Sequence, residues 1–174
     1  VEPDDLSVLH LVTAEEIFFR QQIETLDSKG VECEVCVVPG AEQIDGDMPS
    51  RRGPAEYLRY LPKVQRTLRN GEFDLVHANY GLTAPYAATQ LSLPVVLTLW
   101  GSDVVGFDGL VTKAFAWRAD ALTVRSVEMC ELLGREDAHI VPSGVDLERF
   151  RPIDRGEARD RVGWDSDGIH VLFP

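Results

Sequence analysis

Three short segments of the chain combine hydrogen-bonding side chains with an aromatic ring or a glycine turn. They are VHANYG (76–81), LWGSDV (99–104) and PSGVD (142–146), and each ends or directly follows a strand-like apolar run. Glycine turns at strand ends expose backbone N–H groups, which can hold a polar ligand together with nearby side chains. Each segment would also serve as an ordinary loop. The candidate binding residues are His77, Asn79, Tyr80, Trp100, Gly101, Ser102, Asp103, Ser143, Gly144 and Asp146.

Other chemistries lack the residues that they need. TAEEIFF, which follows the first apolar run, contains no glycine and therefore no P-loop or G-x-G-x-x-G fingerprint. Cys33 and Cys36 are three positions apart in an expected strand, which points their thiols to opposite faces, and no second ligand pair accompanies them. We therefore expect no metal site and no cofactor held by this chain alone.

The candidate residues must be positioned by elements whose pattern is regular. Apolar runs of strand length alternate with stretches of helical periodicity, Thr13 to Glu16 matches a capping box, and Pro54 suits a first helical turn. This alternation predicts an α/β fold, a Rossmann-like doubly wound parallel sheet, with ligands beyond the carboxyl ends of the strands. The expected strands are 6–13, 31–39, 73–78, 94–100, 119–125 and 139–141, and the expected helices are 13–28, 54–70, 83–91 and 110–117.

Length and composition indicate one domain and a remnant. The chain has 174 residues, of which 44% are hydrophobic, and this suits one well-cored domain over 1–150 with a separate segment over 151–174. No apolar run approaches the ~20 residues that cross a bilayer, and the N-terminus lacks the features of an export signal. Three cysteines give no disulfide framework. The expected location is cytoplasmic.

The net charge of −12 comes from 29 acidic and 17 basic residues. Such a surface repels phosphates, so nucleic acid is not an expected partner. An acidic surface suits a cytoplasm of molar salt, where screening over ~3 Å removes the repulsion between carboxylates. A genome biased toward arginine would explain the low lysine content equally well.

One segment departs from this acidic character. Between Arg51 and Asn70, six basic residues face the single acid Glu56, so this segment carries +5 and the rest of the chain −17. At helical spacing the expected core arc is Tyr57, Leu58, Leu61, Val64 and Leu68, and the opposite arc is Arg59, Lys63, Arg66 and Arg69. The arginines either lie in solvent over an ordinary layer helix or, with Arg59, Lys63 and Arg66 foremost, face an anionic membrane at its inner surface.

Four motifs in order carry a family resemblance. DLVHANYG, PVVLTLWGSDV, ADALTVRS and IVPSGVDLERFRP together resemble the N-terminal, acceptor-binding half of the retaining glycosyltransferases of the GT-B fold, family 4 type. The resemblance implies transfer of a sugar from a nucleotide sugar to a hydroxyl of a carbohydrate or lipid-linked acceptor. It also implies that HVLFP begins a nucleotide-sugar domain absent from this chain. That domain would be the chain's partner and would bind the donor, so the chain alone is expected to be inactive.

The resemblance also implies roles for the candidate residues. Trp100 would stack on a sugar, Gly101 and Ser102 would supply the turn and hydrogen bonds, and Asp103, the one candidate for a catalytic carboxylate, would accept from an acceptor hydroxyl. The segment 143–146 would close the floor of the cleft. Family members commonly have histidine at the position of Trp100, and many have one at Asn79, so roles that need an imidazole there do not carry over.

Two other functions fit parts of the pattern. The chain could be a binding module without catalysis, or half of a GT-B-fold nucleotide-sugar epimerase. The G-V-D-x-x-x-F segment that starts at Gly144 favours the transferase over the epimerase.

The charge composition gives a first testable prediction. If the acidic surface is an adaptation to salt, the melting temperature of the chain should rise steeply from low to molar KCl, because screening relieves repulsion between carboxylates. Calorimetry across a salt series measures this. A flat or falling curve would leave genome composition as the explanation.

Overall fold

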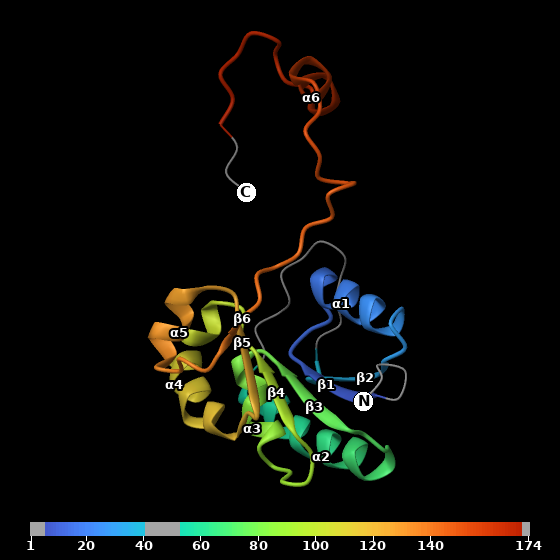
Figure 1. Ribbon diagram of the computed structural model, residues 1–174, viewed down its shortest axis with the longest axis vertical. Helices are drawn as coiled ribbons and strands as arrows, with labels where there is room; N and C mark the ends of the chain where they lie inside the picture. The colour runs from blue at the N-terminus through green and yellow to red at the C-terminus, as the bar shows by residue number, and fades with distance from the viewer. Residues whose placement is uncertain (1–5, 41–52, 172–174) are drawn as a thin grey trace. The chain divides into compact units, whose positions relative to one another are not determined.

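The computed structural model of the chain describes residues 6–40 and 53–171. A six-stranded parallel sheet with the order β2-β1-β3-β4-β5-β6 forms its centre (Figure 1). This confirms the predicted α/β class and the doubly wound parallel sheet. The strands are β1 (Ser7–Val12), β2 (Glu32–Val37), β3 (Leu75–Asn79), β4 (Val95–Thr98), β5 (Ala121–Val124) and β6 (His139–Ile140).

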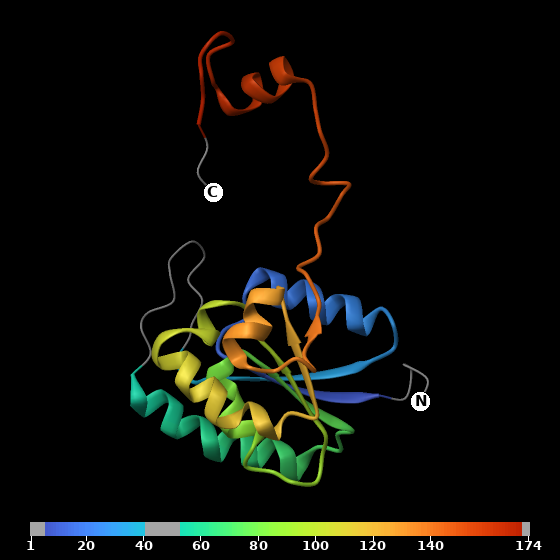
Figure 2. The same cartoon turned by 60° about the vertical axis from the view of Figure 1, so that its left-hand side comes forward.

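Helices cover both faces of the sheet. One face carries α1 (Ile17–Asp27), and the other carries α2 (Pro54–Asn70), α3 (Ala84–Ala87) and α4 (Gly106–Phe115), with α3 in contact with both neighbours (Figures 1 and 2). The remaining helices of the described residues are α5 (Val127–Leu133), α6 (Arg155–Val162) and the 3₁₀ turns η2 (Gly81–Thr83), η3 (Ser102–Val104) and η4 (Ala116–Arg118).

The core lies between the sheet and these helices. Strand side chains such as Leu9, Val76, Leu97 and Leu122 are almost completely buried, because strands of a parallel sheet covered on both faces have no solvent side. The buried Tyr60 of α2 donates its hydroxyl proton to the carbonyl of Cys36, which ties the helix to β2.

Three predicted boundaries were wrong. The capping box at Thr13 does not form, because α1 begins at Ile17 and its N-cap, Glu16, makes no side-chain cap. The helix predicted over 83–91 is the short pair η2 and α3, after which the Gln90 side chain bonds the backbone of Leu93. The helix predicted over 110–117 already begins at Gly106, in α4, because a glycine start gives no sequence signal of its own.

The buried face of α2 was predicted only in part. Val64 is buried and Tyr57 and Leu68 pack against the core, as predicted, but the predicted arc was rotated relative to the observed one. Tyr60 and Val64 are buried, whereas Leu58 and Leu61 are exposed. Spacings of three and four residues from Tyr57 through Tyr60 and Val64 orient the helix, and they turn the two leucines outward beside the arginines. Arg51 and Arg52, counted in the basic segment, lie outside the described residues.

The chain divides into two compact units, Val1–Pro142 and Ser143–Pro174. In the second unit, Asp154 caps α6 by accepting from the N–H groups of Gly156 and Glu157, and Trp164 stacks on His170 with ring centroids 4.5 Å apart. The boundary expected at residue 150 stays a prediction. The strand expected at 170–174 lies mostly outside the described residues.

Close packing at Gly81 gives a prediction about stability. A Cβ added there would lie 1.8 Å from Oγ1 of Thr112, so Gly81→Ala should lower the free energy of unfolding by about 1–3 kcal/mol, as overpacking does. Urea unfolding measures this. Gly144→Ala, where a Cβ meets open space, is the matched control.

A double-variant cycle identifies the cause. Thr112→Ala removes the clashing oxygen, so Gly81→Ala should cost much less in that background. An equal cost in both backgrounds would contradict the packing explanation.

Candidate functional site

The loops that follow β3 and β4 are joined by one carboxylate. Asp103 is fully buried, and its oxygens accept from the backbone N–H groups of Gly81 (3.1 Å), Trp100 (2.9 Å) and Gly101 (2.8 Å). Burial raises the pKa of Asp103, while these N–H donors act in the opposite direction. The structure therefore gives Asp103 backbone partners in place of the acceptor hydroxyl that we predicted, and no exposed surface with which to touch one.

Tyr80 occupies an unusual backbone conformation beside this junction. Its φ of 106° lies in a region that non-glycine residues rarely adopt. The hydroxyl donates to Asp108 (2.9 Å) and lies 3.1 Å from the hydroxyl of Ser102. Burial raises the pKa of Tyr80 to about 12, so the phenol is a neutral donor. Strain of this kind is most common at functional sites.

The ring of Trp100 already has two neighbours. The guanidinium of Arg125 lies 3.8 Å from its centroid, and the ring of Phe18 lies 4.4 Å away at 46°. In this structure Arg125 covers a face of the indole, so the sugar-stacking role predicted for Trp100 would require Arg125 to move. The stack is a cation–π contact, which positions the arginine at the same sheet edge.

A cavity of about 240 Å³ lies at the carboxyl ends of β1, β3 and β4. The loop after β1, the first turn of α1 and the two loops joined by Asp103 form its wall. Its lining residues are Val12, Thr13, Ala14, Glu16, Phe18, Phe19, Asn79, Tyr80, Trp100 and Ser102. Its position is where open parallel sheets bind ligands.

Near this cavity, polar side chains on neighbouring strands form a row across one face of the sheet. The rings of His10 and His77 lie 5.0 Å apart on adjacent strands. Nε2 of His77 is 2.7 Å from Oγ1 of Thr98, which is in turn 2.7 Å from Oγ1 of Thr123. Burial lowers the pKa of His10 to about 4 and that of His77 to about 3, so both imidazoles are neutral near pH 7.

Two atoms of this polar group lack partners within the described part of the chain. Nδ2 of Asn79 is 3.4 Å from Nδ1 of His10, which is a long contact, while Oδ1 of Asn79 and Nε2 of His10 have none. Buried polar atoms without partners are rare and call for an explanation. Asn79 lines the cavity, but its Oδ1 is buried in this structure, so a ligand would reach the amide oxygen only after the side chain rotates.

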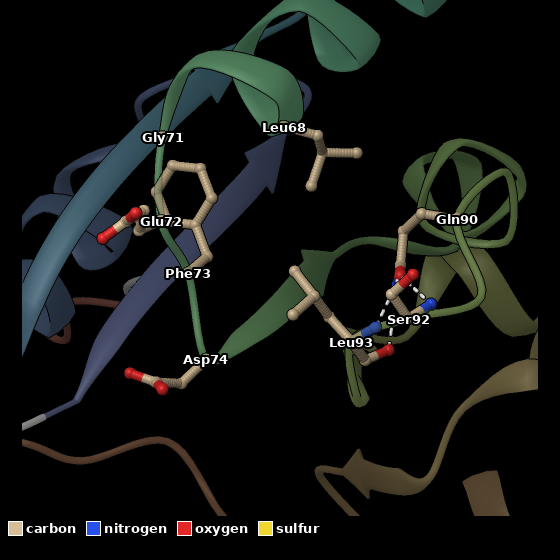
Figure 3. A pocket seen from close by; sticks show the side chains of 8 residues that line it. All are labelled: Leu68, Gly71, Glu72, Phe73, Asp74, Gln90, Ser92 and Leu93. Carbon is tan, nitrogen blue, oxygen red and sulfur yellow. Dashed lines mark hydrogen bonds between the residues drawn. The ribbon is translucent and has the colours of Figure 1, made fainter.

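A larger hollow of about 610 Å³ lies at the opposite edge, before β3 and β4 (Figure 3). Two of its polar side chains, those of Asp74 and Gln90, already have structural partners. Asp74 accepts from the N–H of Ser7, and the amide of Gln90 bonds the backbone of Ser92 and Leu93. It therefore offers less to a polar ligand than the smaller cavity does.

The structure brings some of the predicted residues together. Asn79, Tyr80, Trp100 and Ser102 line the cavity; Gly101 and Asp103 support its loops, and His77 lies buried within β3. Ser143, Gly144 and Asp146 belong to the second unit, where Asp146 accepts from two backbone N–H groups of its own turn.

Sequence reasoning missed His10 and Arg125. His10 is a polar residue inside an apolar strand, which is itself a signal, and Arg125 directly follows β5, where the strand-end argument applies. Arg125 donates to the carbonyl of Val141, and its Nε is buried without a partner among the described residues.

Comparison with known proteins identifies the family. Residues 16–149 match the family model described as Glycosyltransferase Family 4. The chain belongs to this family. This confirms the resemblance drawn from the four motifs, and with it the assignment of the fold as one half of a GT-B fold.

Individual relatives extend the comparison. D-inositol 3-phosphate glycosyltransferase 1 of Catenulispora acidiphila is 30% identical over 125 residues, which are 59% of this chain and 30% of that protein. The D-inositol 3-phosphate glycosyltransferase of Saccharomonospora viridis is 30% identical over 72% of this chain and 35% of its own length. The chain thus spans about a third of these relatives.

A solved structure supports the fold. Sucrose-phosphate synthase from Thermosynechococcus elongatus superposes with a TM-score of 0.67 at 18% identity, covering 92% of this chain and 53% of that one.

In the described ranges, no helix has both the length and the apolar character to span a bilayer, and no cluster of three or more His, Cys, Asp or Glu side chains could hold a metal.

The two buried histidines predict a pH dependence. Their pKa values in the fold, about 4 and about 3, lie below the ordinary 6.5 of the unfolded chain, so between those values the unfolded state binds more protons. Stability is therefore retained above pH 6.5 and lost as the pH falls toward 4. Urea unfolding at pH 7 and pH 5 should differ by on the order of 2 kcal/mol per histidine.

Variants separate the contribution of the histidines from that of Asp103. The raised pKa of Asp103 changes the free energy of unfolding with pH in the opposite direction. His77→Gln should reduce the loss between pH 7 and pH 5, whereas His139→Gln, at an exposed position, should not. An unchanged pH dependence in His77→Gln would show that this imidazole does not control it.

Proposed function

We propose that this chain is the acceptor-binding half of a retaining glycosyltransferase that moves a sugar from a nucleotide sugar to a hydroxyl group. The observation that carries the proposal is the cavity at the carboxyl edge of the sheet, whose wall includes the polar residues Asn79, Tyr80 and Ser102. Membership of Glycosyltransferase Family 4 supports the reaction class.

The cavity favours a small, hydroxyl-rich acceptor. Its volume of about 240 Å³ is below the ~300–1,000 Å³ of sites for drug-sized ligands, and hydroxyls of Thr13, Tyr80 and Ser102 line it. A free monosaccharide, a cyclitol or the exposed sugar of a lipid-linked acceptor has this size and chemistry. The naming of relatives as D-inositol 3-phosphate glycosyltransferases agrees with a cyclitol.

Each lining residue has a role that follows from its chemistry. After rotation of its side chain, the amide of Asn79 bonds an acceptor hydroxyl, and Ser102 and Tyr80 bond neighbouring hydroxyls. Glu16 lines the same cavity and is a further acceptor of hydrogen bonds. Asp103 acts through the loops as a positioning residue and does not touch the acceptor.

The donor side is proposed to lie outside this chain. The chain covers about a third of its relatives, and the loop after β1 carries Glu15 and Glu16 where a diphosphate would need N–H donors. The nucleotide sugar therefore binds a C-terminal partner domain, and no metal or cofactor is required from this half. Free thiols at Cys33, Cys36 and Cys130 support a cytoplasmic location.

Ligand binding tests the division between the halves. By calorimetry, the chain alone should show no binding of UDP- or GDP-sugars at sub-millimolar concentration, whereas the full-length product of its gene should bind one of them. Tight binding by the chain alone would place the donor site here and contradict the proposal. Absence of any transfer by the full-length protein would favour the non-catalytic binding module.

Kinetics on the full-length protein test Asn79. With a panel of monosaccharides, inositol and their phosphates as acceptors, Asn79→Ala should raise KM for the acceptor by roughly two- to tenfold, as the loss of one hydrogen bond does. KM for the donor should stay unchanged. Asn70→Ala, at the exposed end of α2, is the matched control, and equal effects from both variants would exclude a specific role for Asn79.

A further inference from the structure

The wall of the cavity at the carboxyl edge of the sheet carries a negative charge. Among the described residues that line it none is basic, whereas Glu16 contributes a carboxylate. Glu16 is the N-cap residue of α1 and makes no side-chain cap, so its carboxylate is not committed to the first turn of the helix. The N-terminus of a helix attracts anions, but here an acidic side chain of the protein already stands at that end.

Two arginines adjoin this wall, and both have partners elsewhere. Arg20 lies in α1 and forms an ion pair with Glu15 at 3.7 Å. Arg125 lies 3.8 Å from the ring centroid of Trp100 and donates to the carbonyl of Val141 at 2.8 Å. Neither arginine lines the cavity. In the part of the chain that the structure describes, no basic side chain therefore stands beside Glu16 to receive an anionic ligand.

Asp108 sets the direction of the hydrogen bonds between two hydroxyl groups of the wall. The phenol of Tyr80 has one proton, which it donates to Asp108 at 2.9 Å. The hydroxyl of Ser102 lies 3.1 Å from the same phenol oxygen, and Ser102 is the donor of this contact because the phenol proton is already used. The oxygen of Ser102 then has only lone pairs left for a ligand. Ser102 and Glu16 are thus both acceptors toward the cavity.

Another part of the wall is aromatic. The ring of Phe18 lies 4.4 Å from that of Trp100 at 46°. Phe18 is 47% exposed, whereas the neighbouring Phe19 is buried, and Phe18 is the most exposed of the described aromatic residues that line the cavity. A pyranose or cyclitol ring has C–H bonds on its faces and hydroxyls around its edge. One such face can lie on Phe18 while edge hydroxyls donate to Ser102 and Glu16.

We propose that the acceptor bound in this cavity is uncharged: a sugar or cyclitol without a phosphate or carboxylate group, with one C–H face on Phe18 and hydroxyls that donate to Glu16 and Ser102. This inference rests on the function proposed above and specifies the class of its acceptor. A phosphate dianion has no proton to donate, so it would meet two accepting groups and the charge of Glu16. The relatives named D-inositol 3-phosphate glycosyltransferases carry a phosphorylated cyclitol in their names, so the chain departs from them at this point.

The alternative is an anionic acceptor that recruits Arg125. For this, the guanidinium would have to leave both the indole of Trp100 and the carbonyl of Val141 and enter a cavity that it does not line. Its Nε, which is buried without a partner among the described residues, would gain one. Two existing contacts would be exchanged for one ligand, and the carboxylate of Glu16 would remain opposite it. The observed contacts therefore favour the uncharged acceptor.

Acceptor kinetics of the full-length protein test the proposal with pairs that differ by one phosphate, such as inositol and inositol 3-phosphate or glucose and glucose 6-phosphate. The neutral member of a pair should have a kcat/KM at least about tenfold higher, because one carboxylate at short range repels a dianion. Glu16→Gln should reduce this preference to about threefold or less and leave KM for the donor unchanged. Glu15→Gln makes the same change of charge one position earlier, at a carboxylate paired with Arg20, and should keep the preference.

The aromatic contact has its own variants. Phe18→Ala should raise KM for neutral acceptors by roughly two- to tenfold, as the loss of one aromatic contact does. Ile17→Ala, at a position that is 70% exposed and outside the cavity wall, should not. Circular dichroism confirms that all four variants fold, and equal effects at positions 17 and 18 would contradict the role of Phe18.

Contrary results separate this inference from the function on which it rests. Equal or higher kcat/KM for the phosphorylated acceptors would overturn it, and a loss of that activity in Arg125→Gln, but not in the exposed Arg59→Gln, would identify Arg125 as the phosphate ligand. If the full-length protein transfers sugar to no acceptor, the proposed function fails. Saturation-transfer NMR of the 174-residue chain with the same pairs then still measures the preference of the cavity, and stronger binding of the phosphates, or no binding of either member, would overturn the inference.

Discussion

The carboxylate of Asp103 is the group on which the ligand-binding edge of the sheet depends. Loops that leave parallel strands carry backbone N–H groups without a ladder partner, and such groups need acceptors when they are buried. Asp103 accepts from Gly81, Trp100 and Gly101, and a buried carboxylate itself needs such donors. Each requirement satisfies the other, so the loops after β3 and β4 have one relative position, and the cavity wall formed by Tyr80 and Trp100 follows from it.

The strained backbone of Tyr80 is tolerated because its surroundings determine it from several sides. Residues in sparsely populated regions cost about 1–3 kcal/mol. Gly81 is pressed against Thr112 with no room for a side chain, and the Tyr80 hydroxyl bonds Asp108. These contacts hold the phenol in the cavity wall. With an ordinary strand or turn value of φ, the backbone would direct this side chain elsewhere.

The sequence predicted the fold well because its signals are local and repeated. Apolar runs of strand length mark the strands, Pro54 and Gly71 bound the longest helix, and the parallel order follows from right-handed crossovers. The phase of α2 was lost because Leu58, Leu61 and Tyr60 are all apolar, so only packing against β2 decides which of them is buried.

The candidate site was predictable in place but not in role. Strand ends pointed to Asn79, Tyr80, Trp100 and Ser102, which line the cavity. The sequence G-S-D is compatible with an exposed acid or a buried one, and only the three N–H donors that converge on Asp103 decide between them. The pairing of Trp100 with Arg125 joins loops 25 positions apart, and such a contact has no local signature.

The helix α4 fixes the loops around this carboxylate. It begins directly after the loop that holds Asp103, its Asp108 accepts from Tyr80, and its Thr112 donates to the Asp103 carbonyl. Because the inner side of α4 is hydrogen-bonded to the cavity loops, a shift of the helix would strain the bonds that set the cavity wall.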